Sequence, residues 1–260
     1  MGIAAIVSAA ALATSPQTFL LSHQLPSGGF AEPNGTASPE LTAWAIAGLR
    51  ASGAGTGGAL PYLGAHEHEL STPTSIALVA IATAALGRDP GALLARLSPR
   101  PRAVNEAIWD ILAFRQARRP VPKPALTYVL RSQTRGGGFG WTRGARPDSN
   151  DTAFAVQALC AAGVRGKPVA RALAFIRTFQ RKDGGFELAR GRGSDAQSTA
   201  VAIQAFVAAR VTPPRSAFRY LARLRQDDGS YRYSTRYAAT PVWVTAQVMP
   251  ALARKAFPLR

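Results

Sequence analysis

The sequence predicts an all-α protein of six helical hairpins, in which the second helices form an inner ring and the first helices an outer ring. The main observation is an internal repeat: a helical segment that ends in Gln, a Gly-rich turn with an aromatic residue, and a second helical segment with Thr near its start. Four copies are clear, and their Gln and aromatic positions are Gln24 and Phe30, Gln133 and Phe139, Gln180 and Phe186, and Gln226 and Tyr231.

The stretch between Phe30 and Phe139 is long enough for two further copies, in which the Gln and aromatic positions are not recognisable. Residues 60–63 followed by 72–81 fit one copy, and residues 92–97 followed by 105–112 fit the other. The chain then holds six units of about 43 residues each, which is the size of a helical hairpin.

Each unit begins with an amphipathic segment, and a Gly-Gly pair, or Gly-Ser in the last clear copy, ends it. The second segment is almost entirely small and apolar, as in residues 200–209, and a helix that is apolar on all sides must be buried. The second segments are therefore expected in the inner ring. A residue that can cap a helix precedes five of them, namely Ser38, Thr72, Asp148, Asp195 and Thr240.

Residues 171–186, which read RALAFIRTFQRKDGGF, resemble the QW repeat of squalene and oxidosqualene cyclases, with Phe186 where the final Trp usually stands. Similar repeats occur in the β subunits of protein prenyltransferases. The resemblance extends over residues 15–254 and implies an α6–α6 toroid around a central cavity, so that residues 14–260 form one domain. In this superfamily the Gln and the aromatic residue are structural, so the resemblance indicates a fold more strongly than an activity.

Residues 148–153, which read DSNDTA, are similar to the Asp-x-Asp-Asp-Thr-Ala signature of class II terpene cyclases, whose middle Asp protonates a double bond or an epoxide. That step needs a carboxylic acid that stays neutral and is unusually acidic, which the amide of Asn150 cannot replace. Asp151 is the best remaining catalytic candidate, and Glu40, which aligns with Asn150, is the second. Asp148 aligns with Asp195 of the next copy, which favours a helix cap over a catalytic role.

Trp44, Trp109 and Trp243 fall on second helices, where they either face the central cavity or pack between the two rings. In the first case they would form an aromatic wall for an isoprenoid chain or a carbocation. With Asp148 and Asn150 they are the candidate ligand-binding residues. A central cavity lined by aromatic residues with an acid at its base would favour an enzyme, whereas a filled centre would rule out both a ligand-binding protein and a cyclase that use this cavity.

The net charge of +17, from 31 Lys and Arg against 14 Asp and Glu, is unevenly distributed: residues 1–87 carry −3 and residues 88–260 carry +20. The loops after the aromatic residues are expected on one rim of the ring. Together with the N-termini of the inner helices, their arginines would attract a diphosphate head group, an anionic lipid or an envelope polymer, and a solvated surface is the alternative. These rim arginines are Arg143, Arg146, Arg190, Arg192, Arg232 and Arg236.

We expect no nucleic-acid partner, because only four of the basic residues are Lys and no nucleic-acid-binding motif is present. We also expect no metal and no cofactor. Cys160 lies in an apolar run with no His after it, unlike the Asp, Cys and His zinc site of protein prenyltransferases. His66 and His68 are spaced poorly for a metal site.

Residues 1–13, which read MGIAAIVSAAALA, favour a secretory signal peptide, because they are apolar and end in an Ala-x-Ala-like cleavage site. They lack a positively charged start, so a buried or frayed N-terminal helix is the alternative and a membrane anchor the third interpretation. The sequence contains no apolar run of about 20 residues, so it does not predict a transmembrane helix. We expect a secreted or envelope-associated protein, with a cytoplasmic one as the alternative.

Three functional hypotheses follow from these observations. The first is that the central cavity binds an apolar, isoprenoid-type ligand and the basic rim holds its anionic head. The second is a small class II terpene cyclase with Asp151 or Glu40 as the acid. The third is a non-catalytic scaffold that binds a protein or an envelope polymer through the rim.

Overall fold

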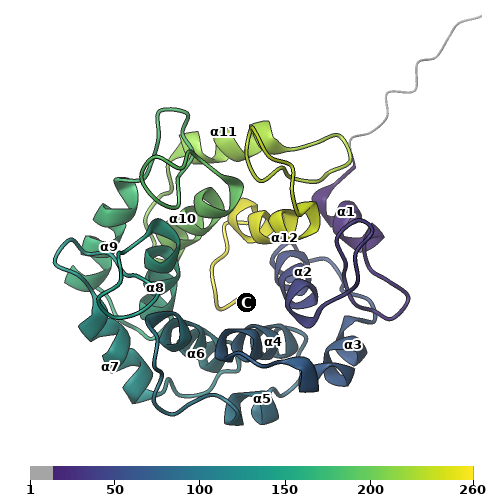
Figure 1. The fold of residues 1–260 in the computed structure, drawn as a ribbon, viewed down its shortest axis with the longest axis horizontal. Helices are drawn as coiled ribbons and strands as arrows, with labels where there is room; N and C mark the ends of the chain where they lie inside the picture. Colours follow the sequence, from purple (N-terminus) through teal and green to yellow (C-terminus); the bar gives the residue numbers. More distant parts are fainter. Residues whose placement is uncertain (1–13, 260) are drawn as a thin grey trace, which may run out of the picture.

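The computed structural model describes residues 14–259, and within that range it contains α-helices and one short 3-10 helix (Glu67–Glu69) but no strand. Outer and inner helices alternate along the chain and form two concentric rings (Figure 1). The inner helices are α2 (Pro39–Ala51), α4 (Pro73–Ala85), α6 (Val104–Gln116), α8 (Ser149–Ala161), α10 (Ala196–Ala208) and α12 (Pro241–Leu252). The outer helices are α1 (Pro16–Ser22), α3 (Ala59–Ala65), α5 (Gly91–Ala95), α7 (Lys123–Ser132), α9 (Lys167–Arg177) and α11 (Arg215–Leu224).

The ring is closed, because each inner helix packs against the next and α12 packs against α2. The predicted fold class, an α6–α6 toroid of six helical hairpins, is therefore confirmed. Residues 1–13, for which the sequence favours a signal peptide, lie outside the described residues. None of the helices within residues 14–259 is long and apolar enough to cross a membrane.

The repeated Thr holds each loop to the inner helix of its own hairpin. In all four clear copies its hydroxyl oxygen accepts a hydrogen bond of 2.9 Å from the backbone N–H of the aromatic residue. The pairs are Phe30 with Thr42, Phe139 with Thr152, Phe186 with Thr199, and Tyr231 with Thr245. Since these groups are buried, the bond explains why Thr recurs at this position.

The repeated Gln and Gly residues connect hairpins to the next one, with a side-chain bond from Gln24, Gln133 and Gln180, whereas the amide of Gln226 bonds within its own hairpin. The side-chain amide of Gln133 donates to the carbonyl of Gly137 in its own turn and to the carbonyl of Pro168, just inside the next outer helix. Gly138 lies against an aromatic ring of that helix, where a Cβ would come within 2.6 Å of Phe175. Only Gly allows this close approach, so the Gly-Gly pair does more than end a helix.

Side-chain caps begin four of the inner helices as predicted, with Ser38, Thr72, Asp148 and Asp195 each accepting from a backbone N–H of the first turn. The prediction for Thr240 is wrong, because this residue has a φ of 47° and makes no side-chain cap. The carboxylate of Glu32 accepts instead from the N–H groups of Val242 (3.0 Å) and Trp243 (2.8 Å). The first loop of the chain thus caps its last inner helix.

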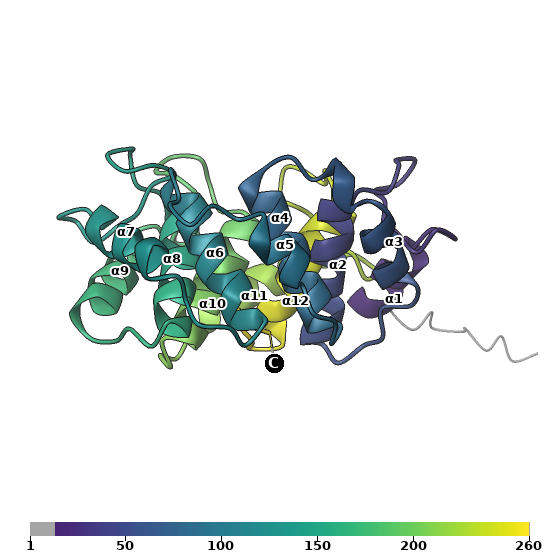
Figure 2. The same ribbon diagram turned by 90° about the horizontal axis from the view of Figure 1, so that it is seen from below.

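The two faces of the ring differ. The rim loops project from one face, which we call the mouth, and the chain after α12 crosses the opposite opening (Figure 2). We call residues 253–259 the C-terminal tail. In this tail Phe257 and Leu259 are buried, so it belongs to the core of the ring.

Candidate functional site

The centre of the ring contains an aromatic floor made of Trp44, Trp109, Phe154 and Phe257. The ring centroid of Trp109 lies 5.7 Å from that of Trp44, 4.9 Å from that of Phe154 and 6.0 Å from that of Phe257. The first three residues come from α2, α6 and α8, whereas Phe257 comes from the C-terminal tail. At this level the centre is filled by side chains, which argues against a ligand in the centre of the ring itself.

Two buried glutamines hold the tail in place. The side-chain oxygen of Gln157 accepts from the backbone N–H of Phe257 at 3.0 Å. The amide of Gln116 makes two bonds to Leu259, accepting from its N–H at 2.6 Å and donating to its carbonyl at 2.9 Å. These bonds satisfy backbone groups of the tail inside the ring, which fixes the position of Phe257.

A polar layer lies about one helical turn nearer the mouth than the floor. Asp151 precedes Phe154 by three residues and Asn105 precedes Trp109 by four, so each polar side chain stands above the aromatic ring of its own helix. The side-chain amide of Asn105 donates to Asp151 at 3.4 Å, and its oxygen accepts from the hydroxyl of Thr74 at 2.9 Å. This chain of bonds joins α4, α6 and α8.

Burial shifts the titration of the carboxyl groups in this part of the ring. Burial and, to a smaller extent, the nearby charge of Asp148 together raise the pKa of Asp151 to about 7, whereas the bond from Asn105 opposes the shift. Burial also raises the pKa of Asp148, although the bond from the backbone of Asp151 opposes it. Asp151 is therefore partly protonated at neutral pH, which a proton donor requires.

Asp110, on α6, is a second buried carboxyl group that the sequence reasoning missed. Burial raises its pKa to about 7, with a smaller contribution from the charge of Glu106. Among the described residues its Oδ1 atom has no hydrogen-bond partner. A buried carboxyl group in this situation favours its neutral form.

A groove of about 430 Å³ opens at the mouth between the N-terminal ends of α2 and α12. We call it the mouth groove. It contains Trp44, Trp243 and Glu40, three of the sequence-predicted site residues, and its other lining residues are Glu32, Ser38, Leu41 and Thr240. Trp44 also belongs to the aromatic floor, so the groove continues into the floor.

The other predicted site residues lie elsewhere on the ring. Trp109 is buried in the floor, and Asp148 and Asn150 are half-buried at the start of α8. Within residues 14–259, no hydrogen bond joins Glu40 to Asp151, and the two acids lie on different inner helices. The structure thus divides the predicted residues among the mouth groove, the aromatic floor and the first turn of α8.

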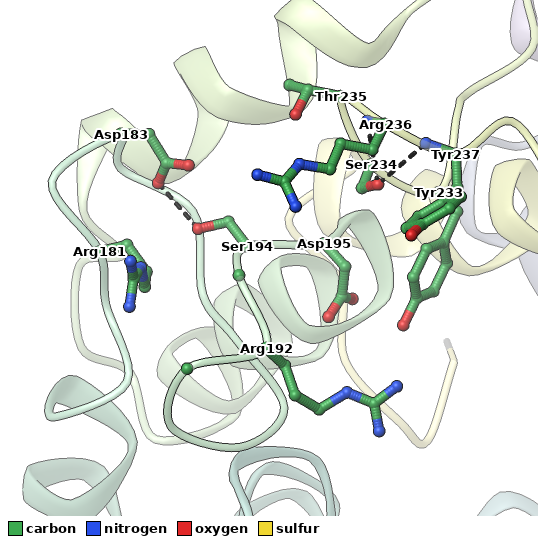
Figure 3. Close-up of a pocket in the computed structure, with 12 residues that line it drawn as sticks. Arg181, Asp183, Arg192, Ser194, Asp195, Tyr233, Ser234, Thr235, Arg236 and Tyr237 are labelled. Atoms are coloured by element: carbon green, nitrogen blue, oxygen red, sulfur yellow. Dashed lines mark hydrogen bonds between the residues drawn. The ribbon is translucent and has the colours of Figure 1, made fainter.

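The six rim arginines do not form one site. Arg143 lies on the outer side of the ring with Arg131, and Arg190 stacks on the ring of Phe179 at 5.4 Å. Arg146 is exposed and Arg232 is half-buried. Arg192 and Arg236 line the same pocket, between the loop at residues 187–194 and the loop at residues 232–239, but their side chains extend in different directions (Figure 3).

The N-termini of several inner helices are already occupied by rim loops. The first-turn N–H groups of Asn105, Ser149 and Ala196 donate to carbonyls of the next rim loop, at 3.1, 3.1 and 2.7 Å. On α12 the carboxylate of Glu32 takes this role. These groups are therefore not available to an anion, contrary to the expectation that the helix N-termini would help to form an anion-binding mouth.

Phe154, a member of the aromatic floor, could have been identified from the sequence. Trp44, Trp109 and Phe154 each lie six residues after the N-cap of their helix, so the repeat itself points to Phe154. No such signal exists for Phe257, which lies beyond the repeat.

Cys160 is buried, and burial raises the pKa of its thiol. The imidazole of His66 stacks on Tyr62. Within residues 14–259, no cluster of three or more His, Cys, Asp and Glu residues has an arrangement that could hold a metal ion.

Comparison with known proteins identifies the class to which this ring belongs. The sequence pattern of the prenyltransferase alpha-alpha toroid domain matches residues 108–239, which is half of the chain. The protein therefore belongs to the prenyltransferase alpha-alpha toroid family. A comparison with curated protein sequences gave no match.

Solved structures with a similar fold carry different activities. The type II terpene cyclase MstE from Scytonema, in complex with geranylgeranyl dihydroxybenzoate, is 14% identical with a TM-score of 0.68, and the match covers 92% of this chain and 95% of that one. The ent-copalyl diphosphate synthase from Streptomyces platensis is 22% identical with a TM-score of 0.58, over 83% of this chain and only 50% of that one. A glycosidase is 13% identical with a TM-score of 0.67, over 92% and 94%. At these identities the likeness shows the fold alone.

Proposed function

We propose that this toroid binds an apolar ligand of the isoprenoid class in the mouth groove, above the aromatic floor. The observation that carries the proposal is the pairing of Trp44 and Trp243 in one open groove of about 430 Å³. Both indoles are half-buried, so they offer apolar surface that a ligand would remove from water. The ligand of the Scytonema cyclase includes a geranylgeranyl group, which supports this ligand class for a ring of the same fold.

The charges around the groove are compatible with an apolar ligand. Glu32 uses both carboxylate oxygens to cap α12, so its charge is already stabilised by backbone N–H groups. Glu40 lies at the start of α2, where the helix dipole favours a carboxylate. The aromatic faces remain as the main binding surface, and they would also stabilise a positive charge on a ligand.

Tryptophan fluorescence tests this proposal with farnesol as the probe. The experiment uses the Trp141→Phe variant as its background, because Trp141 is 57% exposed and would add an unrelated signal. We expect saturable quenching that Trp243→Ala weakens about tenfold or more, since that change removes one wall of the groove. Leu130→Ala, at an exposed outer-helix position, is the matched control. Equal affinity in the Trp243→Ala variant and the control would refute the proposal.

A second candidate function is acid-initiated isoprenoid cyclisation, which is supported by the raised pKa of Asp151 because it favours the neutral form of the acid. The acid would donate its proton to a ligand double bond, whose π electrons form the new C–H bond and leave a carbocation and a carboxylate. A second double bond of the ligand would then attack the cation to close a ring, and loss of a proton to water would give the neutral product. Geranylgeranyl substrates are the probe, with products followed by mass spectrometry. We expect Asp151→Asn to abolish any cyclised product, and Asn150→Asp to increase it by completing the acidic motif. Unchanged turnover in the Asp151→Asn variant would eliminate Asp151 as the acid.

We further propose that the protein is exported, on the basis of residues 1–13 alone. Expression of the full chain in a bacterial host with separation of its compartments tests this. Export predicts a mature chain that starts near Thr14 outside the cytoplasm, whereas an intact N-terminus in the cytoplasm would refute it.

A further inference from the structure

A groove of about 510 Å³ lies on the outer wall of the ring, between α7 and the segment that leads from α5 to α6. We call it the outer groove. That segment belongs to the hairpin in which the Gln and aromatic positions are not recognisable, so this part of the wall departs from the repeat. No carboxyl group lines the outer groove, whereas four cationic side chains do, namely Arg100, Lys123, Arg131 and Arg143.

The positive charge of the outer groove is not compensated by the chain itself. All four cations are exposed, and within residues 14–259 none of them takes part in a side-chain hydrogen bond or an ion pair. Residues 88–147 contain 12 Lys and Arg but only three acids. Asp89 forms an ion pair at 2.9 Å on a neighbouring loop, Glu106 accepts from two backbone N–H groups at the start of α6, and Asp110 is buried.

The lining between the charges is less polar, and it comes from Pro101, Pro124 and Tyr128. The hydroxyl of Tyr128 donates to the carbonyl of Arg102 at 3.0 Å, which holds α7 against the opposite wall. On that wall the hydroxyl of Ser98 donates to the carbonyl of Arg100 at 3.0 Å and accepts from its N–H at 3.2 Å. Hydrogen bonds thus hold both walls in place, which reduces the entropy lost when a ligand binds.

The charges on α7 lie along a line and do not converge on one point. Lys123, Thr127 and Arg131 are four residues apart, so they share one face of the helix. Eight residues of helix separate Lys123 from Arg131 by about 12 Å along the axis. An extended peptide rises about 3.3 Å per residue, and every second side chain is on the same face. Acids four positions apart in such a peptide are therefore about 13 Å apart, with one residue between them that faces the same way.

We propose that the outer groove binds an extended acidic segment of another protein, in which two acidic residues four positions apart flank an apolar residue. The two carboxylates would pair with Lys123 and Arg131, and the residue between them would lie against the ring of Tyr128. The apolar part of the lining favours a peptide over an inorganic polyanion, which has no apolar group to place there. The inference is independent of the isoprenoid proposal, because the outer groove and the mouth groove share no residue.

Fluorescence anisotropy with a labelled peptide tests this inference. The probe is Glu-Ser-Leu-Ser-Glu between glycines, with fluorescein at its N-terminus, in buffer of low ionic strength, where screening is weak. The double variant Lys123→Gln/Arg131→Gln should bind it about tenfold more weakly, because both charges that match the acids are removed. Arg215→Gln/Arg219→Gln is the matched control: it removes two charges from exposed positions of the outer helix α11, and we expect a loss of about twofold at most.

Each outcome decides the proposal. Selective loss in Lys123→Gln/Arg131→Gln supports it, whereas equal losses in the two double variants would show attraction by the overall charge and overturn it. No measurable binding to the native chain would overturn it as well. Melting temperatures of both variants verify that they are folded.

Two further probes test the kind of ligand. The reordered peptide Glu-Ser-Leu-Glu-Ser has the same composition, but its acids lie on opposite faces of an extended chain. It should bind about fivefold more weakly, and equal binding would overturn the extended arrangement. Inorganic tripolyphosphate should compete less well than the unlabelled first peptide; better competition would identify a general polyanion site and overturn the proposal.

Discussion

Replacement of Phe257 by Ala would remove the side chain that the C-terminal tail places in the ring centre. Phe257 is 2% exposed, and its ring lies 6.2 Å from that of Trp44 and 6.0 Å from that of Trp109. Burial of this kind makes a Phe-to-Ala change cost about 3–5 kcal/mol, part of it from the cavity left behind. For a chain of this length, that corresponds to a fall in melting temperature of about 10 °C.

Chemical denaturation and thermal melting measure this cost. Leu252→Ala is the control, because Leu252 lies just before the tail and is 38% exposed, so its loss is expected to be small. The Phe257→Ala variant should also gain affinity for benzene, seen as a rise in its melting temperature, because an apolar cavity bounded by indole rings stays dry. A variant as stable as the native chain, with no response to benzene, would refute the description of the floor.

Two further predictions concern stability. Burial raises the pKa of Asp110 to about 7, so its charged form destabilises the fold above that pH and not below pH 4. Asp110→Asn should therefore be more stable than the native chain at pH 8, by at most about 4 kcal/mol, and equal at pH 4 in urea titrations; equal curves at pH 8 would contradict this. Gly185→Ala should lower the unfolding free energy by about 2 kcal/mol or more, because its Cβ would lie 2.6 Å from Ser194 and 2.8 Å from the ring of Tyr220. Gly64→Ala, whose Cβ would meet nothing within 4 Å, is its control, and equal losses would contradict the proposed clash.

The fold was predictable because each repeated residue makes the same contact in several hairpins. Thr199 recurs because its hydroxyl binds the N–H of Phe186, and Gly185 recurs because the ring of Tyr220 lies against it. Each such contact is made within a hairpin or between neighbouring hairpins, so it leaves the same residues at the same spacing in several copies. A periodic pattern of this kind specifies how the hairpins associate, and a closed ring follows when the last meets the first.

The site was only partly predictable, because its features break the repeat. Trp44 was identified as a candidate from its position on an inner helix, and Asp151 from the resemblance of residues 148–153 to a catalytic signature. Phe257 could not be, since nothing in the residues after α12 indicates that they turn back into the ring. The occupied helix N-termini were equally hidden, because the carbonyls that occupy them carry no sequence signal. Every residue type has a backbone carbonyl, so the sequence does not indicate which carbonyl accepts these hydrogen bonds.

The proposed binding surfaces lie where the ring departs from its own symmetry. Six identical hairpins would present the same side chain six times around the mouth, which suits packing but not the recognition of an asymmetric ligand. At the junction of α12 and α2 the usual cap is missing, Glu32 replaces it, and Trp243 takes a position that is polar in the other clear copies. The closure of the ring thus produces the mouth groove. Substitutions at this junction should therefore change ligand binding more than stability, whereas substitutions in the repeated contacts should do the reverse.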